Sequence, residues 1–160
     1  MDESCQREKN TLEGSRNCPG RVKKFMKEFE VLEHRTDLII RAFGKDRKEL
    51  FLNALLGMAK SQKPTIKNKE KVKRKIQVKS LDLSALLVDF LNEVLYLNQV
   101  KKEVYTEIKF EKLLDKELKG EIIGNRIEKF GEDIKAATHH DLEIKQKEDK
   151  IWQATVIFDI

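Results

Sequence analysis

The last two residues of the chain bring two carboxylates together. Asp159 carries one on its side chain, and Ile160 carries the other at the chain terminus. Both groups offer only oxygen acceptors at neutral pH, and two such charges repel unless a hard cation or a basic partner lies between them. These residue types favour a site for a divalent cation. The alternative is a strand that simply ends at the surface, and the residues alone leave both interpretations open.

An earlier aspartate is a candidate third ligand. Asp37 directly precedes the strand-like run from Leu38 to Phe43, so we expect it at the start of a strand. With Asp159 and the Ile160 carboxylate it would form an all-oxygen site suited to Ca²⁺, Mg²⁺ or Mn²⁺, in contrast to a thiolate or imidazole site. A single Asp at a turn also often caps the local backbone, and the spacing does not decide between the two roles.

Two adjacent histidines are further candidates for chemistry. His139 and His140 precede a strand-like stretch from Leu142 to Ile144. If this stretch is extended, the two side chains point to opposite faces, so they cannot both serve one site. One of them could carry protons or bind a metal, and a hydrogen-bonded structural histidine is the alternative.

Hydrophobic periodicity predicts the elements that would position these groups. Alternate residues from Trp152 to Phe158 share one face of a final strand. Asp46 and Asp82 are expected to cap two helices, and the second helix has an apolar stripe over 83–95. The expected strands span residues 25–33, 38–43, 75–79, 104–112, 117–124, 134–145 and 151–158. This order indicates an α+β domain in which two helices pack on antiparallel or mixed sheets.

Positive charge is concentrated in one segment. The 160 residues contain 33 Lys and Arg against 28 Asp and Glu, and residues 60–79 alone hold nine basic side chains and one Glu. This segment could attract RNA phosphates or an acidic partner. A solvated loop or a basic edge strand would also explain it. The candidate contacts are Lys71, Lys73, Arg74 and Lys75.

Signatures of common enzymes and of export are missing from the sequence. It has no GxGxxG, Walker A, HExxH or GxSxG motif, and Cys5 and Cys18 form neither a CxxC pattern nor a disulfide framework. No apolar run is long enough to span a membrane, and the first 25 residues lack a signal-peptide core. We therefore expect a cytoplasmic protein that is not an enzyme, with no membrane and no DNA among its partners.

Four segments in order resemble the archease family. LLVDFLNEVLYL at 86–97 is similar to the family's second helix, and EHRTD followed by IIRAFG at 33–44 is similar to its His-Thr-Ala-Asp segment and strand. KAATHHD at 135–141 resembles a Lys-Ala-x-Thr-Tyr-His-Asp run, and the chain ends on Asp-Ile as family members do. The resemblance covers about residues 31–160. The chain departs from the family pattern at 35–39 and at Asn125, and the loop expected at 126–132 is shorter than usual.

The resemblance implies a function and a set of site residues. Archeases activate GTP-dependent RNA ligases of the RtcB type, by promoting guanylylation and multiple turnover in tRNA splicing or RNA repair. By this likeness Asp37, Asp159 and the C-terminal Ile160 would bind a divalent cation, calcium among the candidates, with Lys135 and His140 near the site. The family fold combines strand–helix–strand–strand modules. Residues 1–22 are polar and show no periodicity, so we expect them to be a flexible N-terminal extension, and residues 23–160 would be the archease-like domain.

Two other functions use the same residues. A metal-dependent phosphoesterase or nuclease could hold its catalytic ion with the same carboxylates, but it needs a water-activating base and a phosphate clamp. For these the chain offers only His140 and scattered lysines. A modulator or chaperone of an RNA-modifying enzyme could instead contact RNA through the basic segment at 60–79.

Overall fold

The computed structural model of the chain describes residues 27–33 and 36–160. The expected N-terminal extension at 1–22, with Cys5 and Cys18, lies outside the described residues. The elements follow one another along the chain as β1 (Phe29–Glu33), β2 (Asp37–Gly44), α2 (Arg47–Ser61), β3 (Pro64–Lys79), α3 (Leu83–Lys101), β4 (Glu103–Leu113), β5 (Glu117–Phe130), β6 (Ala136–Gln146) and β7 (Trp152–Asp159).

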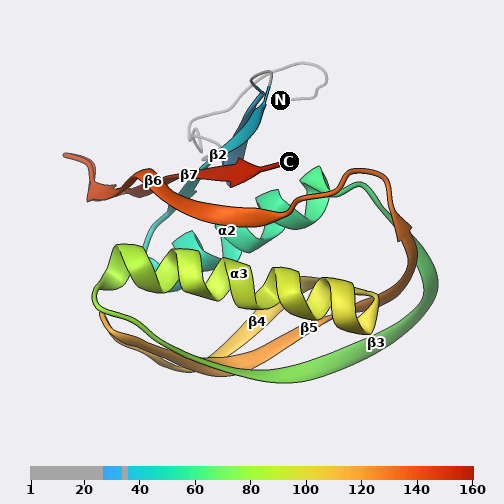
Figure 1. Cartoon of the computed structure of the whole chain (residues 1–160). Helices are drawn as coiled ribbons and strands as arrows, with labels where there is room; N and C mark the ends of the chain where they lie inside the picture. Colours follow the sequence, from blue (N-terminus) through green and yellow to red (C-terminus); the bar gives the residue numbers. More distant parts are fainter. Residues whose placement is uncertain (1–26, 34–35) are drawn as a thin grey trace, which may run out of the picture.

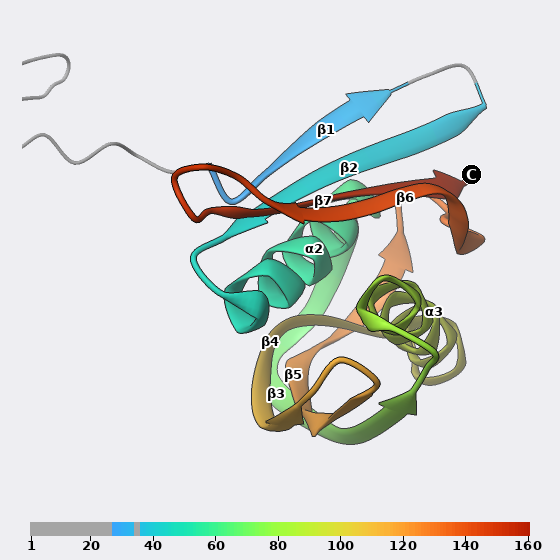
Figure 2. The ribbon, with the colours of Figure 1, turned by 90° about the vertical axis from the view of Figure 1, so that its left-hand side faces the viewer.

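Two antiparallel sheets enclose the helices. The first sheet has four strands in the order β1-β2-β7-β6, and the second has three in the order β3-β5-β4. Both α2 and α3 lie between the two sheets (Figures 1 and 2). This arrangement confirms the predicted α+β class, with all of the recorded strand pairings antiparallel.

The helices begin at the residues that the sequence indicates. The Asp46 side chain accepts a hydrogen bond of 2.8 Å from the Glu49 backbone N–H, and Asp82 accepts one of 2.8 Å from Ala85. These bonds satisfy donors that the first turn of a helix leaves unpaired. The apolar stripe of α3 is buried among the residues of the core, as expected for a single domain.

The core fills the space between the sheets. Phe51 of α2 and Phe90 of α3 are fully buried, and their ring centroids lie 5.9 Å apart. The central strand β7 contributes Ala154, Val156 and Phe158 from one face. Burial of that face holds the last strand of the chain in place up to Asp159.

Two strands are longer than the sequence predicts. β3 begins at Pro64, whereas the sequence predicts a strand over 75–79 only, and β5 continues to Phe130, whereas the sequence predicts a loop at 126–132. In both extensions most side chains are exposed, so the hydrophobic alternation that marks a half-buried strand is missing. Pairing of β3 with β5 extends these strands, with irregular register between Thr65 and Lys71.

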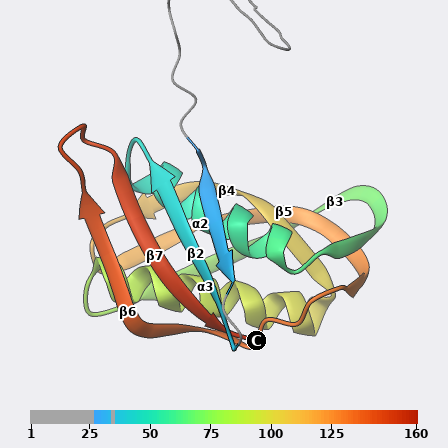
Figure 3. The ribbon, with the colours of Figure 1, turned by 90° about the horizontal axis from the view of Figure 1, so that it is seen from above.

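The outer face of the four-stranded sheet is not covered by a helix (Figure 3). Along β2 and β7 the even-numbered residues from 38 to 44 and from 154 to 158 are buried, while the odd-numbered residues of β2 are half-buried. Odd-numbered residues of these two strands therefore belong to the outer face. In the part of the chain that the structure describes, no helix has the length and hydropathy needed to cross a membrane.

Candidate functional site

The two predicted aspartate ligands meet across neighbouring strands. Asp37 is the first residue of β2 and Asp159 is the last residue of β7, and they are direct partners in the antiparallel register. Side chains at directly opposite positions of such a pair have their Cβ atoms about 4.5–5.5 Å apart. Both residues are at odd-numbered positions, so their carboxylates share the outer face of the sheet. They lie at the end of the sheet where β2 begins and β7 stops, which we call the corner.

The backbone of Asp159 is held from both sides. On one side it pairs with Asp37, and on the other it pairs with Ala136 of β6. The Lys135 backbone N–H also donates a hydrogen bond of 2.8 Å to the Asp159 carbonyl. Because β7 is an inner strand of the sheet, the Asp159 carboxylate is positioned by a regular ladder up to one residue before the terminus.

An asparagine of α3 anchors the start of β6. The Asn92 amide donates to the Ala137 carbonyl at 3.0 Å and its oxygen accepts from the Ala137 N–H at 2.7 Å. β6 is an edge strand, so these backbone groups face away from β7 and need a partner from elsewhere. Asn92 lies outside the apolar stripe of α3, and nothing in the local sequence pattern around it indicates this contact.

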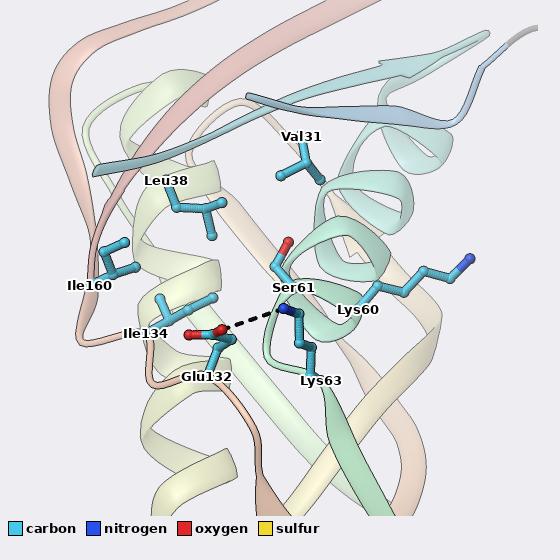
Figure 4. A pocket seen from close by; sticks show the side chains of 8 residues that line it. All are labelled: Val31, Leu38, Lys60, Ser61, Lys63, Glu132, Ile134 and Ile160. Atoms are coloured by element: carbon cyan, nitrogen blue, oxygen red, sulfur yellow. Dashed lines mark hydrogen bonds and ion pairs between the residues drawn. The ribbon is translucent and has the colours of Figure 1, made fainter. Parts of the chain in front are cut away.

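A cavity of about 380 Å³ lies under the same corner (Figure 4). Ile160 contributes its side chain to this cavity and is 49% exposed. An ion pair of 3.4 Å between Lys63 and Glu132 lies on the opposite side of the cavity from Leu38. The lining residues are Val31, Leu38, Lys60, Ser61, Lys63, Glu132, Ile134 and Ile160. The terminal residue therefore turns its apolar side chain inward, while Asp159 belongs to the outer face.

The donor set at the corner fits a hard divalent cation. Asp37 and Asp159 supply two carboxylates on one face, and like charges directly opposite in a sheet destabilise it unless they are compensated. Within residues 27–33 and 36–160, no group of three or more His, Cys, Asp or Glu side chains could hold a metal ion. A cation here would thus depend on the two aspartates and the terminal carboxylate. Since Ca²⁺ takes about 6–8 oxygen ligands, most positions would remain for water or for a partner molecule.

Lys135 and His140 differ in how near they come to this corner. Lys135 is exposed and directly precedes Ala136, the β6 partner of Asp159. His140 lies farther along β6, in the stretch after Thr138 where the register with β7 is interrupted. Its backbone N–H donates to the Thr138 hydroxyl at 3.3 Å. The neighbouring His139 contacts Asp89 of α3 at 3.7 Å, so the two histidines have different environments.

The basic segment is divided between the two faces of β3. Lys71, Lys73 and Lys75 are exposed on the outer face, whereas Arg74 turns inward and makes hydrogen bonds of 3.0 and 2.7 Å to the buried carboxylate of Glu103. The Tyr105 hydroxyl also donates to Glu103 at 2.6 Å. Period-two alternation with the buried Ile76 and Val78 would have placed Arg74 on the inner face.

This network changes the proton affinity of its members. The Arg74 hydrogen bonds lower the pKa of Glu103 against the opposing effect of burial, and the Tyr105 hydroxyl lowers it further. The same hydrogen bonds raise the pKa of Arg74. Burial and the bond to Glu103 raise the pKa of Tyr105. The three side chains therefore form a fixed network within the fold, in which the Arg74 guanidinium is used by its ion pair with Glu103.

Comparison with known proteins identifies the family. The model of the Archease protein family matches residues 29–160. Protein archease of Methanosarcina barkeri is 35% identical over 142 residues, which cover 84% of this chain and 97% of the relative. Protein archease of Pyrococcus furiosus is 32% identical over 143 residues, which cover 84% of this chain and 100% of the relative.

Two solved structures share the fold. The solution structure of protein 1598 of Methanobacterium thermoautotrophicum is 29% identical, with a TM-score of 0.61 over 84% of this chain and 100% of that one. The crystal structure of an archease from Thermotoga maritima, described as a possible chaperone, is 21% identical, with a TM-score of 0.58 over 86% of this chain and 100% of that one. The sequence match and the shared architecture agree: this chain belongs to the archease family.

Proposed function

We propose that this protein is a non-enzymatic activator of a GTP-dependent RNA ligase of the RtcB type. It would promote guanylylation of the ligase and its repeated turnover in tRNA splicing or RNA repair, and it would act in the cytoplasm. Membership of the archease family supports this proposal. A relative described as a possible chaperone is also in keeping with a protein that acts on another protein.

The observation that carries the proposal is the opposition of Asp37 and Asp159 at an open corner of the sheet. We propose that these two carboxylates and the Ile160 terminus hold Ca²⁺, Mg²⁺ or Mn²⁺. When bound, such an ion supplies positive charge that can engage phosphate oxygens of a nucleotide. The corner has few protein ligands, so it can be shared with a nucleotide in the site of the ligase.

The rigidity of the strand ends supports this proposal. Asp37 and Asp159 are fixed by the strand ladder, and Asn92 fixes the adjoining end of β6 through Ala137. A rigid site loses little conformational entropy when it docks. To stimulate guanylylation, the protein must bind the competent state of the ligase more tightly than the resting state.

The direct test is guanylylation of the ligase of the same organism with labelled GTP, in the absence of RNA, with and without this protein. We expect a higher guanylylated fraction when the protein and a divalent cation are both present. No stimulation of a ligase that is shown to be competent would contradict the proposal.

A phosphoesterase or nuclease activity is the alternative from another class. It requires a base near the metal, and the candidate His140 lies within the interrupted stretch of the β6–β7 ladder, farther along β6 than Ala136, the residue that pairs with Asp159. Metal-dependent hydrolysis of RNA or nucleotides by the purified protein alone would favour this alternative over the activator. Modulation of an RNA-modifying enzyme would instead require a partner other than the ligase.

A further inference from the structure

The outer face of the three-stranded sheet is strongly basic. The helices pack against the inner face of β3, β4 and β5 and leave the outer face open (Figure 1). The register of the three strands brings lysines from all of them onto this outer face. The lysines are Lys71, Lys73, Lys75 and Lys79 of β3, Lys109 and Lys112 of β4, and Lys119 of β5.

Part of this charge is uncompensated. Glu107 pairs with Lys71 at 3.7 Å, and Glu117 pairs with Lys112 at 3.3 Å. Glu121 stands between Lys75 and Lys109 in the register, and Glu111 is exposed beside Lys112 at the irregularity of β4. Across the described residues, no side-chain hydrogen bond or ion pair is recorded for five of the lysines, which are Lys73, Lys75, Lys79, Lys109 and Lys119. Of these five, Lys79 acts on Glu117 as a nearby charge.

The position of these lysines argues against a purely protective role. Lysines on an edge strand prevent it from pairing with another sheet, which could account for those of β3 and β4. Lys119, however, belongs to β5, the middle strand, whose backbone is already paired on both sides. Alternate residues of a strand are about 6.7 Å apart and neighbouring strands about 4.8 Å apart, so the ammonium groups form a two-dimensional array.

The composition of the face favours a nucleic acid over a protein. Protein interfaces are enriched in aromatic residues and Arg and depleted in Lys. Of the large apolar residues that are exposed in the described part of the chain, only Ile66 belongs to these three strands, and it lies in the irregular stretch of β3 away from the lysines. Ile123, which lies on this face, is only 6% exposed. Point charges on flexible stems with no apolar anchor suit the phosphate backbone, which binds through charge and without sequence preference.

We propose that the outer face of β3-β5-β4 binds the phosphate backbone of RNA, with Lys73, Lys75, Lys109 and Lys119 as the principal contacts. The choice of RNA over DNA rests on the proposed function. The basic character of the face is an observation that is independent of that function. This surface belongs to the opposite sheet from Asp37 and Asp159 (Figure 2), so the protein could hold RNA and present its terminus at the same time.

Binding of the full chain to a fluorescein-labelled RNA hairpin, followed by fluorescence anisotropy over a range of NaCl concentrations, tests this proposal. The test variant is Lys73→Gln/Lys75→Gln/Lys109→Gln/Lys119→Gln. The matched control removes the same number of charges elsewhere: Lys45→Gln/Lys48→Gln/Lys145→Gln/Lys150→Gln. We expect the test variant to bind about tenfold more weakly, with a salt slope smaller by about 3, because each lost phosphate contact removes about 0.7–0.9 from the slope. The control should resemble the wild type, and DNA of the same length should bind comparably.

Three results would overturn the proposal. The first is that the wild type does not bind RNA at low salt. The second is that RNA affinity falls equally in the test variant and the control. The third is that the same face binds a poly-glutamate peptide in preference to RNA. Guanylylation without RNA reports on the terminus alone, and anisotropy reports on the sheet face alone. A failure of one proposal is thereby distinguished from a failure of the other.

Discussion

Asp37 and Asp159 stand directly opposite each other where β2 and β7 begin and end. They are 122 positions apart in the numbering of the chain, from 37 to 159, yet the antiparallel register makes them neighbours on the uncovered face of the sheet. Two opposed carboxylates cost free energy in the absence of a counter-charge. The fold therefore tolerates a local repulsion at the corner where we propose a cation.

Removal of one carboxylate should change stability in opposite directions with and without a cation. In a chelating buffer, Asp159→Asn should be more stable than the wild type by roughly 0.2–1 kcal/mol, because the like-charge pair is lost. With Ca²⁺ or Mn²⁺ at about 100 times its dissociation constant, the wild type should gain about 2.7 kcal/mol and the variant much less. Thermal unfolding measures both effects. Asp149→Asn, in the hairpin at the other end of β7, should keep the gain, and a gain of equal size in Asp159→Asn would exclude Asp159 as a ligand.

Extension of the chain beyond Ile160 should weaken cation binding without disturbing the fold. A Gly-Ser tail converts the terminal carboxylate into a peptide carbonyl, which removes a charged ligand. The last strand ends at Asp159 and Ile160 is 49% exposed, so the tail has space to leave the sheet. Titration calorimetry should show at least a tenfold loss of affinity, about 1.4 kcal/mol. Unchanged affinity would remove the Ile160 carboxylate from the site.

The contact between Asn92 and Ala137 should matter for both stability and activation. Asn92→Ala leaves the N–H and the carbonyl of Ala137 without their partners, which should cost about 1–3 kcal/mol in chemical denaturation. Asn92→Asp keeps an acceptor for the N–H but places a carboxylate beside the carbonyl, so it should not restore full stability. Ligase stimulation should fall in both variants because Asp159 is held by the adjoining Ala136. Full stability of Asn92→Ala would contradict the anchoring role.

The ion pair of Arg74 and Glu103 should show itself in the pH dependence of stability. The pKa of Glu103 is held below its ordinary value of 4.5, so its charged form stabilises the fold above about pH 4.5. This contribution is lost as the pH falls through the depressed folded-state pKa. At pH 7, Glu103→Gln should be less stable by about 1–3 kcal/mol, since Glu103 is 1% exposed and Arg74 would lose its partner. The difference from the wild type should shrink on acidification.

A matched control for this measurement is Glu107→Gln. Glu107 forms an exposed pair with Lys71, and exposed pairs contribute little. The free energy of unfolding of this variant should equal that of the wild type at every pH. A difference between wild type and Glu103→Gln that stays constant down to pH 3 would show that the charge of Glu103 does not carry the effect.

Elements with local signals are those that the sequence predicts well. Both helix starts are marked by capping aspartates, and β2 and β7 are marked by alternation that continues over their whole length. The first half of β3 and the end of β5 lack such alternation because few of their side chains reach the core. Their strand structure depends on pairing between distant segments, which no local pattern encodes.

The site was predictable in its residue types and not in its geometry. Asp37 and Asp159 could be proposed from carboxylate chemistry and from the family resemblance, but their opposition follows from the register of β2 with β7. Asn92 could not be found, because an amide on the polar side of a helix gives no indication of the edge strand that it meets. Likewise Lys109 and Lys119 join the basic segment only through strand order.

The measurement that tests the central proposal most directly is ligase guanylylation with wild type, Asp159→Asn and Asp149→Asn side by side. The assay contains GTP, a divalent cation and no RNA. We predict strong stimulation by the wild type and by Asp149→Asn, and stimulation reduced at least tenfold in Asp159→Asn, which corresponds to about 1.4 kcal/mol. Undiminished stimulation by a folded Asp159→Asn variant would contradict a role for the paired carboxylates in activation.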